Sequence, residues 1–336
     1  MFLSSTICCA LPLLGAATFF YLAKIYNSDL LLLPMIWMIY RFMRHFLRNS
    51  AYLTNRGVVV TGCDTGFGKA IALQLAKEGA VVFAGVMDSN NGQNLAKIAA
   101  DFAGVIEPVV MNVTKQEDID NCVQIVEKSG VILHGVVCNA GISAFGYCEM
   151  LPLSRYEINM DVNYFGAVRV TRAFLPMIRA SRGRVVNMGS IGAHAPSAFG
   201  SAYLSTKAAM VSFSQCLRQE LHKFGVRVSL VEPGFFRTDL LASGSANGAD
   251  GAQKQGSGPY GDYEQKMAAT AKAIQASEVA NDWLSGGVPG VVDCVVDALC
   301  NRHPLARYVV GIDAHLLRHV VCFLPAWVVD WAQTLS

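Results

Sequence analysis

The 336-residue chain is predicted to form a single α/β domain built on a doubly wound parallel sheet. Two observations support this prediction. Short runs of β-branched and other apolar residues alternate with longer stretches of helical periodicity over residues 55–315. A glycine-rich turn follows the first run and leads into a helical pattern, as at the first strand of such a sheet. Sheets of this class with about 250 residues commonly remain one domain.

The expected elements follow from these patterns in chain order. Gly57–Thr61 is a β-branched run, and the apolar positions of Ala70–Leu75 recur at helical spacing. Two longer helices are expected at Ser154–Ala180 and Ala202–Phe224. The further strands are expected at Val81–Gly85, Val105–Met111, Gly135–Cys138, Arg184–Met188, Val226–Val231 and Tyr308–Gly311.

The turn after the first strand carries three glycines, Gly62, Gly66 and Gly68. Glycines let the backbone approach a pyrophosphate, and the N-terminus of the following helix stabilises its negative charge. The order T-G-x-x-x-G-x-G differs from the usual G-x-G-x-x-G dinucleotide pattern. Because glycines also mark plain turns, this segment alone is a weak signal for a nucleotide.

Ser190, Tyr203 and Lys207 form a second chemical pattern. Tyr203 and Lys207, four residues apart, share one face of a helix. An ammonium group beside a phenol favours the phenolate, so we expect a lowered pKa for Tyr203 and proton exchange with an alcohol oxygen. Ser190 lies 13 residues before Tyr203, at the end of an expected strand, where its hydroxyl could hold that oxygen. The alternative is a surface helix in which the pair occurs by chance.

Together these motifs resemble the short-chain dehydrogenase/reductase family over residues 55–315. The resemblance includes TGCDTGFG at the glycine turn, CNAG at Cys138–Gly141, Asn163 in MDVNYFG, and PGFFRT at Pro233–Thr238. Two positions depart from the family pattern: Cys138 replaces the first asparagine of N-N-A-G, and Gly189 precedes Ser190 where serine is common. Neither removes a catalytic group, although the cysteine could loosen a hydrogen bond between strands.

The resemblance implies a Rossmann-type fold and reversible hydride transfer between a nicotinamide ring and a carbonyl or secondary alcohol. Tyr203 would exchange the proton, and Ser190 would hold the substrate oxygen. Lys207 would lower the pKa of Tyr203 and bind the nicotinamide ribose, and Asn163 would position a relay water near Lys207. The cofactor-binding residues implied in this way are Gly62, Asp64, Thr65, Gly66, Phe67, Gly68, Asp88, Asn112, Val113, Asn139, Ala140, Gly141, Tyr203, Lys207, Pro233, Gly234 and Thr238.

The choice between NAD and NADP depends on charge at the end of the second strand. An acid there binds the ribose hydroxyls and repels a 2′-phosphate, whereas an arginine would bind the phosphate. Asp88 follows this strand, and no lysine or arginine lies between Lys77 and Lys97. We therefore expect NAD, with NADP as the alternative. A competing interpretation is that Asp88 only caps the next helix.

Within the family, the chain looks most like the subgroup of hydroxysteroid, retinol and 3-hydroxybutyrate dehydrogenases. The substrate wall implied by this subgroup consists of Ser143, Phe145, Ser190, the 194–199 loop, Phe235 and Phe236. This wall is apolar and offers no evident cation for a small carboxylate. We therefore expect a lipophilic secondary alcohol or ketone, steroid-like or retinoid. The alternatives are a 3-hydroxybutyrate-type dehydrogenase of small hydroxy acids and a catalytically quiet nucleotide-binding scaffold.

Residues 1–48 are strongly apolar and end in a basic flank. Ile7–Ala23 and Leu30–Tyr40 are apolar runs, and three arginines follow them. The first run is near the lower length limit for crossing a bilayer, and the arginines favour a cytosolic face for the rest of the chain. We expect a membrane anchor, as one span or a shallow hairpin, in the endoplasmic reticulum, with the mitochondrial membrane as the alternative. A cleaved signal peptide is the competing interpretation, but the segment lacks a basic start.

Two other segments have an unusual composition. Residues 242–262 are rich in glycine, serine and alanine and bury too little apolar surface to offset ordering, so we expect a mobile loop. It would be a lid over the substrate or a neutral insertion. Residues 316–336 are apolar and contain two tryptophans. They fit a helix that closes the substrate pocket, lies on membrane lipid or contacts another subunit of a homo-oligomer, with a plain core helix as the alternative.

The bulk composition argues against several other classes. A formal net charge of +2 and the lack of a basic, aromatic-interleaved patch in the sequence give no case for nucleic acid. The ten cysteines are scattered, which favours a reducing compartment over a disulfide framework. The seven histidines have no metal-binding spacing, so no metal is expected. His194 could touch substrate, but a surface position is the simpler expectation.

Overall fold

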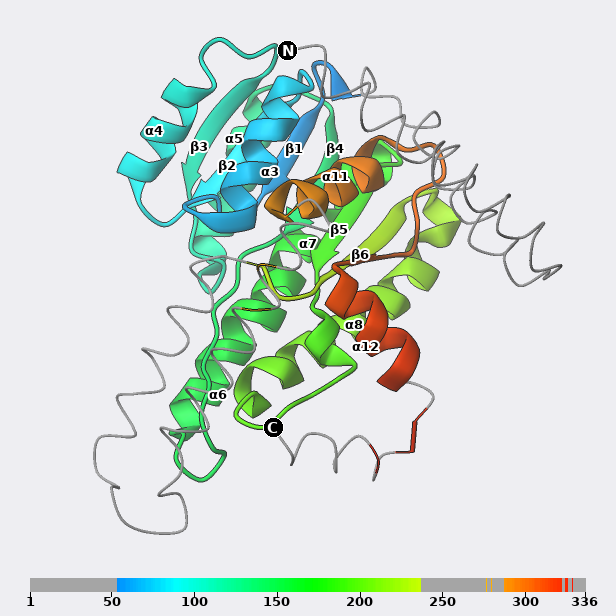
Figure 1. Ribbon diagram of the computed structural model, residues 1–336. Helices are drawn as coiled ribbons and strands as arrows, with labels where there is room; N and C mark the ends of the chain where they lie inside the picture. The colour runs from blue at the N-terminus through cyan, green and yellow to red at the C-terminus, as the bar shows by residue number, and fades with distance from the viewer. Residues whose placement is uncertain are drawn as a thin grey trace, which may run out of the picture. The chain divides into compact units, whose positions relative to one another are not determined.

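The computed structural model describes residues 53–236 and 287–321, together with positions 276, 279, 324, 325 and 328 (Figure 1). The predicted anchor at residues 1–48, the predicted lid at 242–262, most of the 316–336 segment and Thr238 lie outside these residues. In the part of the chain that the structure describes, no helix is long and apolar enough to cross a membrane.

A seven-stranded sheet with the order β3-β2-β1-β4-β5-β6-β7 forms the centre of the domain, and all of its strand pairs are parallel. The strands are β1 (Gly57–Val60), β2 (Val81–Val86), β3 (Val105–Val110), β4 (Leu133–Cys138), β5 (Arg184–Met188), β6 (Arg227–Pro233) and β7 (Arg307–Val310). Every predicted strand is present, and no end differs from its predicted position by more than two residues. The predicted doubly wound α/β fold is confirmed.

Burial explains why the strands have these compositions. All residues of β1 and β4 are buried, because helices cover both faces of the central strands, and such strands are continuous apolar runs. β3 forms an edge of the sheet, and only two of its six residues, Ile106 and Val109, are buried. β3 also holds Pro108, a residue that sheets tolerate at edges, where no neighbour needs its missing N–H.

The helices form a layer on each face of the sheet (Figure 1). On one face, α5 (Gln116–Lys128), α7 (Ala167–Ala180) and α8 (Ser201–Leu221) pack in a single apolar cluster with the strands. α3 (Gly66–Lys77), α4 (Ser89–Ile98) and α11 (Gly287–Cys300) cover the other face, and α12 (Ile312–Val321) follows β7. The predicted helix at Ser154–Ala180 is divided: α6 (Leu153–Met160) continues through a π-helical turn, η3 (Asp161–Gly166), into α7.

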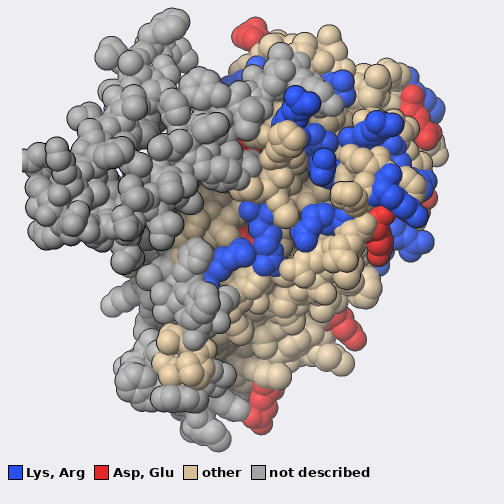
Figure 2. Space-filling model, turned by 90° about the vertical axis from the view of Figure 1, so that its right-hand side faces the viewer, with Lys and Arg blue, Asp and Glu red and all other residues tan. Residues whose placement is uncertain are grey.

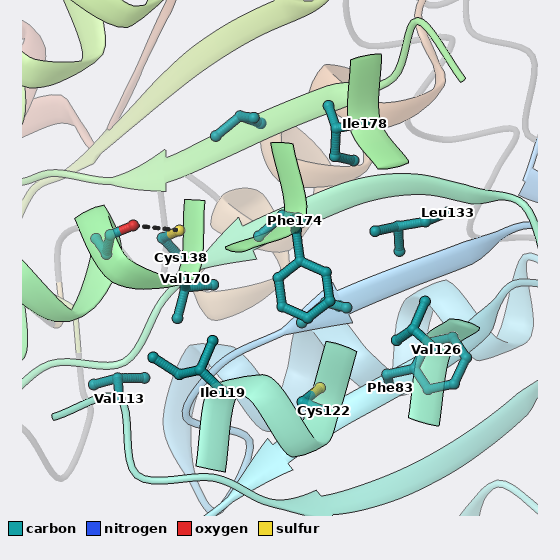
Figure 3. Close-up of a cluster of buried hydrophobic side chains, with 14 of the residues drawn as sticks. Phe83, Val113, Ile119, Cys122, Val126, Leu133, Cys138, Val170, Phe174 and Ile178 are labelled. Carbon is teal, nitrogen blue, oxygen red and sulfur yellow. Dashed lines mark hydrogen bonds between the residues drawn. The ribbon is translucent and has the colours of Figure 1, made fainter. Parts of the chain in front are cut away.

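The core between the sheet and α5, α7 and α8 contains Cys138 (Figure 3). Phe83 and Phe174 fill its centre and are fully buried. The Cys138 thiol lies 3.8 Å from the Ala167 carbonyl oxygen, and the strand pairing between β4 and β5 continues through Cys138 and Asn187. The cysteine therefore does not loosen this pair of strands. Burial raises the pKa of its thiol to about 11, so the sulfur is an apolar group of the core at neutral pH.

The amino edge of the sheet carries a basic surface that the linear sequence hides. Residues 179–184 and 217–228 contain six lysines and arginines and one acid, Glu220, whereas the whole chain has 27 cations and 25 acids. Pairing of β5 with β6 brings these segments together. Figure 2 shows lysine and arginine side chains gathered on one face of the molecule, with few acidic side chains among them. The linear sequence does not reveal this surface, because segments about 40 residues apart form it only in the folded sheet.

Candidate active site

The predicted site residues lie at the carboxyl edge of the sheet, where the parallel strands end. The glycine turn follows β1, Asn139 follows β4 and Ser190 follows β5. β1 and β4 are neighbours in the sheet but not in the chain, and ligands of open α/β sheets bind at such a switch point. The sheet therefore brings Gly62 to the same edge as Ser190, which is 128 residues further along the chain.

The glycine turn leaves the start of α3 open to an anion. Gly62 and Gly66 have φ angles of +69° and +57°, a region that residues with a Cβ rarely adopt. A Cβ on Gly62 would lie 2.9 Å from the Ala140 Cα. Thr65 is the N-cap of α3 but makes no side-chain capping hydrogen bond, and the first turn has no acid. The backbone N–H groups and the positive helix end therefore fit the pyrophosphate of a nicotinamide cofactor.

Asn139 and Thr61 fix the glycine turn against the end of β4. The Thr61 hydroxyl accepts hydrogen bonds from the N–H groups of Asn139 and Ala140 at 3.0 and 2.9 Å. The Asn139 side-chain amide donates to the carbonyls of Thr61 and Gly62 at 2.9 and 3.1 Å. Asn139 thus holds the loop that would bind the cofactor. Thr61 was not singled out from the sequence, because a threonine at a strand end has no distinctive pattern.

Two carboxylates, Asp64 and Asp88, meet at the end of β2. Asp64 accepts hydrogen bonds from the N–H groups of Met87 and Asp88 at 2.9 and 3.1 Å and from the Asn91 amide at 3.1 Å. Asp88 is exposed and accepts a hydrogen bond from the Asn90 N–H at 2.8 Å as the N-cap of α4. The capping interpretation of Asp88 therefore describes its geometry, and its charge still lies at the carboxyl edge beside Asp64.

Asn112, Val113 and Gly141 also lie at this edge, and protein groups occupy their surroundings. The Asn112 side-chain oxygen accepts hydrogen bonds from the backbone and hydroxyl of Thr114 at 3.0 and 2.8 Å. Val113 is buried in the core cluster. A Cβ on Gly141 would lie 3.2 Å from the Asn163 side-chain oxygen. The Asn112 backbone N–H also donates to the Asp118 carboxylate at 2.9 Å.

Ser190, Tyr203 and Lys207 are brought together as the sequence predicted. Tyr203 and Lys207 lie one turn apart on α8 and are 7% and 5% exposed. The Tyr203 phenol is hydrogen-bonded to Ser190, and the Lys207 Nζ lies 5.5 Å from the centroid of the Tyr203 ring. The Lys207 ammonium also donates a hydrogen bond to the Met188 carbonyl at 3.1 Å.

The pKa values of this group differ from the expectation. Burial raises the pKa of Tyr203 above its ordinary value, and the hydrogen bond from Ser190 opposes this shift only in part. The expected lowering by Lys207 is not seen, because removal of the phenolate from water dominates the pKa of Tyr203. Burial also lowers the pKa of Lys207 to about 8. Tyr203 is therefore a neutral phenol at pH 7, ready to donate a proton.

Asn163 lies in the π-helical turn η3 and is buried. Its side-chain oxygen accepts a hydrogen bond from the Ile142 N–H at 2.8 Å. Its amide donates to the Ile142 carbonyl at 2.9 Å and to the Thr206 hydroxyl at 3.0 Å. Asn163 therefore joins the loop after β4 to α8 next to Lys207. π-Helical turns inside α-helices occur frequently at functional sites.

The predicted substrate wall is assembled only in part. The Phe145 ring centroid lies 5.8 Å from that of Tyr203, so Phe145 borders the reacting group. Ser143, two residues earlier in the chain, is buried. In the 194–199 loop, Phe199 packs against Tyr147 with 4.6 Å between ring centroids. Its φ angle of +67° is strained for a bulky residue, which fits a loop held in one shape at a functional site.

Phe235 and Phe236 follow β6, and the Phe236 ring packs toward the glycine turn. Phe236 is 2% exposed, and its ring packs edge-on against Phe67 of the glycine turn at 6.0 Å. The Phe235 N–H donates to the Asp313 carboxylate at 2.9 Å. After Pro233, a Cβ on Gly234 would overlap the same carboxylate. Asp313 at the start of α12 thus shapes the segment after β6, and Phe236 belongs to the nucleotide end of the site.

A buried ion cluster that no pattern in the sequence indicates lies behind Ser190. The Glu232 carboxylate is 0% exposed and contacts His194 at 2.6 Å, Arg318 at 3.2 Å and Arg307 at 3.7 Å. A Cβ on Gly189 would lie 3.3 Å from the Glu232 Cγ, so Glu232 occupies part of the space that a side chain at position 189 would need. His194 is therefore not a simple surface residue. It ties the loop after Ser190 to β6, β7 and α12.

Within the described ranges, no group of three or more histidine, cysteine or acidic side chains could hold a metal ion. The chemistry available to these residues is proton transfer and hydrogen bonding to an oxygen. Both processes occur beside a loop that fits a dinucleotide.

Comparison with known proteins agrees with this geometry. Residues 56–248 match the model of the short chain dehydrogenase family. Estradiol 17-beta-dehydrogenase 2 of Rattus norvegicus is 34% identical over 339 residues, which cover 98% of this chain and 82% of that protein. Retinol dehydrogenase 16 of Mus musculus is 35% identical over 304 residues, 88% of this chain and 92% of that protein. The mitochondrial D-beta-hydroxybutyrate dehydrogenase of Bos taurus is 41% identical, but over 187 residues, 54% of each chain.

The family match spans more than half of the chain, and two of these relatives match along most of their own length. The glycine turn, the Asn139 loop and the Ser190, Tyr203 and Lys207 group occupy the switch point of one parallel sheet. The chain belongs to the short-chain dehydrogenase/reductase family, in the subgroup that includes the hydroxysteroid and retinol dehydrogenases.

Proposed function

We propose that this protein is an NAD-dependent oxidoreductase that interconverts a lipophilic secondary alcohol, steroid-like in size, with its ketone. The observation that carries the proposal is the buried group at the carboxyl edge. In it, the Tyr203 phenol is hydrogen-bonded to Ser190, and the Lys207 ammonium lies 5.5 Å from the phenol ring. A phenol held in this way can exchange a proton with a substrate oxygen while bulk water is excluded.

The nicotinamide ring of a bound cofactor would accept or supply the hydride. In the reductive direction, the Tyr203 phenol donates its proton to the oxygen of the carbonyl as that oxygen gains negative charge. The Ser190 hydroxyl donates a hydrogen bond to the same oxygen and orients it. In the oxidative direction, the alcohol proton passes to the Tyr203 phenolate oxygen as the carbinol hydrogen leaves as hydride. Lys207 stabilises the phenolate electrostatically.

The remaining roles are assigned from position. The glycine turn at Gly62–Gly68 and the backbone at Asn139–Gly141 would hold the cofactor, with Pro233–Gly234 beside the nicotinamide. The side-chain polar atoms of Asn163 are bound to Ile142 and Thr206. Asn163 would therefore serve by fixing the position of the π-helical turn. This arrangement would place backbone groups of the turn, and a relay water bound to them, near Lys207.

Two observations favour NAD over NADP. Asp64 and Asp88 place two carboxylates at the end of β2, where a 2′-phosphate would lie. The chain has no lysine or arginine between positions 77 and 97 to neutralise that phosphate. The combined charge of the two acids is a stronger argument than Asp88 alone.

The described part of the substrate site favours a bulky apolar ligand. The Phe145 ring lies beside Tyr203, and the Tyr147 and Phe199 rings pack together in the adjoining loops. Burial of apolar surface contributes about 25 cal/mol per Å². The runner-up, a small hydroxy acid, would need a cation for its carboxylate. The Arg318 guanidinium and the His194 ring near the Ser190 loop are both bound to Glu232. Estradiol and retinol, which the relatives' names specify, are bulky and apolar, and this agreement supports the proposal.

We further propose the arrangement of the whole chain. Residues 1–48 would anchor it to the endoplasmic reticulum membrane, with a cytosolic catalytic domain at 55–315. Residues 242–262 would form a lid, and 316–336 an apolar segment beside the substrate or the membrane. The apolar runs followed by three arginines in the sequence support the anchor and its orientation.

The substrate class can be tested with the purified full chain and NAD. We expect NADH formation with hydroxysteroids, and weaker activity or none with 3-hydroxybutyrate, because the described wall has aromatic rings and no free cation. Fluorescence of the reduced cofactor measures the reaction. Efficient oxidation of 3-hydroxybutyrate without activity on steroids or retinoids would assign the runner-up function.

Replacement of the proposed acid/base group tests the mechanism. Tyr203→Phe removes the hydroxyl but keeps the ring, so turnover should fall at least about a hundredfold while cofactor affinity stays nearly constant. Tyr156→Phe is the matched control, because the Tyr156 hydroxyl also bonds a serine, Ser201, at 2.6 Å. The control should keep turnover within about threefold. Similar losses in both variants would contradict the role of Tyr203.

Burial of Lys207 predicts a stability cost with a defined pH dependence. A lysine whose folded-state pKa is lowered from 10.5 to about 8 destabilises the fold below pH 8, and this cost disappears as pH rises to 10.5. Lys207→Met should therefore raise the free energy of unfolding at pH 7 by up to about 3 kcal/mol and abolish turnover. The gain should vanish above pH 10.5. Denaturant titrations at pH 7 and 10.5 measure it, with the exposed Lys97→Met as control. A destabilised Met variant at pH 7 would refute this account.

The cofactor assignment can be tested at Asp88 without loss of the helix cap. Asn caps helices as well as Asp, so Asp88→Asn removes the charge and keeps the hydrogen bond to Asn90. The wild type should bind NAD more tightly than NADP, and the variant should narrow this preference by about tenfold. Fluorescence titration with both cofactors gives the ratio. Tighter binding of NADP by the wild type would refute the NAD assignment.

A further inference from the structure

The basic surface at the amino edge has no role in the proposed chemistry, which takes place at the opposite edge of the sheet. We define the basic patch as Arg179, Arg182, Arg218, His222, Lys223, Phe224 and Arg227. None of its arginines or lysines forms an ion pair with an acid in the described part of the chain. Such a concentration of like charge is unfavourable in the isolated protein and becomes favourable beside an anionic partner.

The contacts show that the patch is one continuous surface. Arg218, His222 and Arg227 line a hollow of about 480 Å³ at the end of α8. The Arg227 N–H bonds the Gly183 carbonyl at 3.2 Å, which joins the hollow to the start of β5. At the other end of the patch, Phe224 is 38% exposed. The Arg179 guanidinium and the Lys223 ammonium lie 5.3 and 5.1 Å from its ring centroid.

We propose that the basic patch docks on the anionic headgroups of a membrane surface. Clustered lysines and arginines attract anionic lipid. The hollow has two arginines, a histidine and five uncharged residues in its lining, so it offers positive charge to a lipid phosphate beside apolar surface. The exposed ring of Phe224 between two cations fits the interface between headgroups and acyl chains, where aromatic side chains are favoured.

The direction of the chain supports lipid as the partner rather than an acidic protein or a nucleic acid. β1 is parallel to β5 and β6, so Leu53 and Gly57 enter the sheet at the same amino edge as the patch. β1 lies two strands from β5 and three from β6, roughly 10 to 15 Å. Five residue steps from Arg48 to Leu53 span at most about 18 Å. An anchor at residues 1–48, which this inference takes from the proposed function, would therefore keep the amino edge close to the bilayer.

The docked orientation has a consequence for the substrate. The carboxyl edge with Tyr203 would face away from the bilayer surface. A lipophilic substrate would then reach the site from the aqueous side or along segments outside the described residues, and not directly from the membrane beneath the patch.

The lipid preference can be measured with the full chain in sedimentation with vesicles of phosphatidylcholine, alone or with 30% phosphatidylserine. A triple variant neutralises three cations of the basic patch: Arg218→Gln, Lys223→Gln, Arg227→Gln. It should bind the anionic vesicles at least tenfold more weakly than the wild type and bind phosphatidylcholine vesicles equally well. The matched control, Lys69→Gln, Lys115→Gln, Arg172→Gln, removes the same charge from exposed residues that lie away from the amino edge, at the start of α3, at the N-cap of α5 and within α7. It should stay within twofold of the wild type.

The orientation is tested by Phe224→Trp and Phe165→Trp in vesicles of brominated lipid. Phe165 is 48% exposed and lies in η3, away from the patch. The Phe224→Trp variant should show more quenching of tryptophan fluorescence than the wild type, and the Phe165→Trp variant should not. Three results would overturn the proposal. The two triple variants could prefer anionic over neutral vesicles to the same extent, or lipid could quench only the tryptophan introduced at position 165. The protein could also bind polyglutamate or RNA and not the anionic vesicles. None of these readouts depends on turnover, so they are independent of a failure of the proposed enzymatic activity.

Discussion

The contact between the glycine turn and the end of β4 is the constraint on which the rest of the structure depends. Thr61 accepts two backbone hydrogen bonds from the segment after β4, and the Asn139 side chain returns two to the segment after β1. These four bonds close the switch point of the sheet, with no space for a side chain on Gly62. They place the open start of α3 beside the loop that carries Gly141 and Ile142. That loop in turn holds Asn163, and Asn163 holds α8 through Thr206. The nucleotide loop and the proton-transfer group thus share one chain of hydrogen bonds.

Burial gives the proton-transfer group its chemical character and makes it costly to maintain. A lysine and a tyrosine that are both more than 90% buried are rare outside functional sites, because each must lose water before it can ionise. A hydrogen bond to the Met188 carbonyl offsets part of this cost for the Lys207 ammonium, and a hydrogen bond to Ser190 offsets part of it for Tyr203. In this state the pair is set for proton donation to a carbonyl. Phenolate formation, which alcohol oxidation requires, needs further positive charge beside the ring, and the oxidised nicotinamide would supply such a charge.

A second buried charge, Glu232, organises the other side of the site. It brings together the loop after Ser190, the last strand and α12 by a hydrogen bond with His194 and ionic contacts with Arg307 and Arg318. A buried carboxylate is tolerated only when it is compensated in this way, so these elements are positioned together. The packing of Glu232 against Gly189 also gives a physical reason for the glycine at that position. The Ser190 loop is therefore fixed at both of its sides, by Glu232 and by the strained Phe199.

The sequence by itself determined the fold class, the seven strands and the group of Ser190, Tyr203 and Lys207. These features depend on local periodicity, on glycines at one turn and on spacing along one helix, all of which a linear pattern carries. It could not determine the direction of the Tyr203 pKa shift, because desolvation depends on how α8 packs against the sheet. The Glu232 cluster joins positions 194, 232, 307 and 318, and the basic patch joins two segments about 40 residues apart. Phe235 and Phe236 are neighbours in sequence, yet one contacts Asp313 and the other Phe67. Only the tertiary structure decides such features, because long-range strand pairing and packing choose the partners of each side chain.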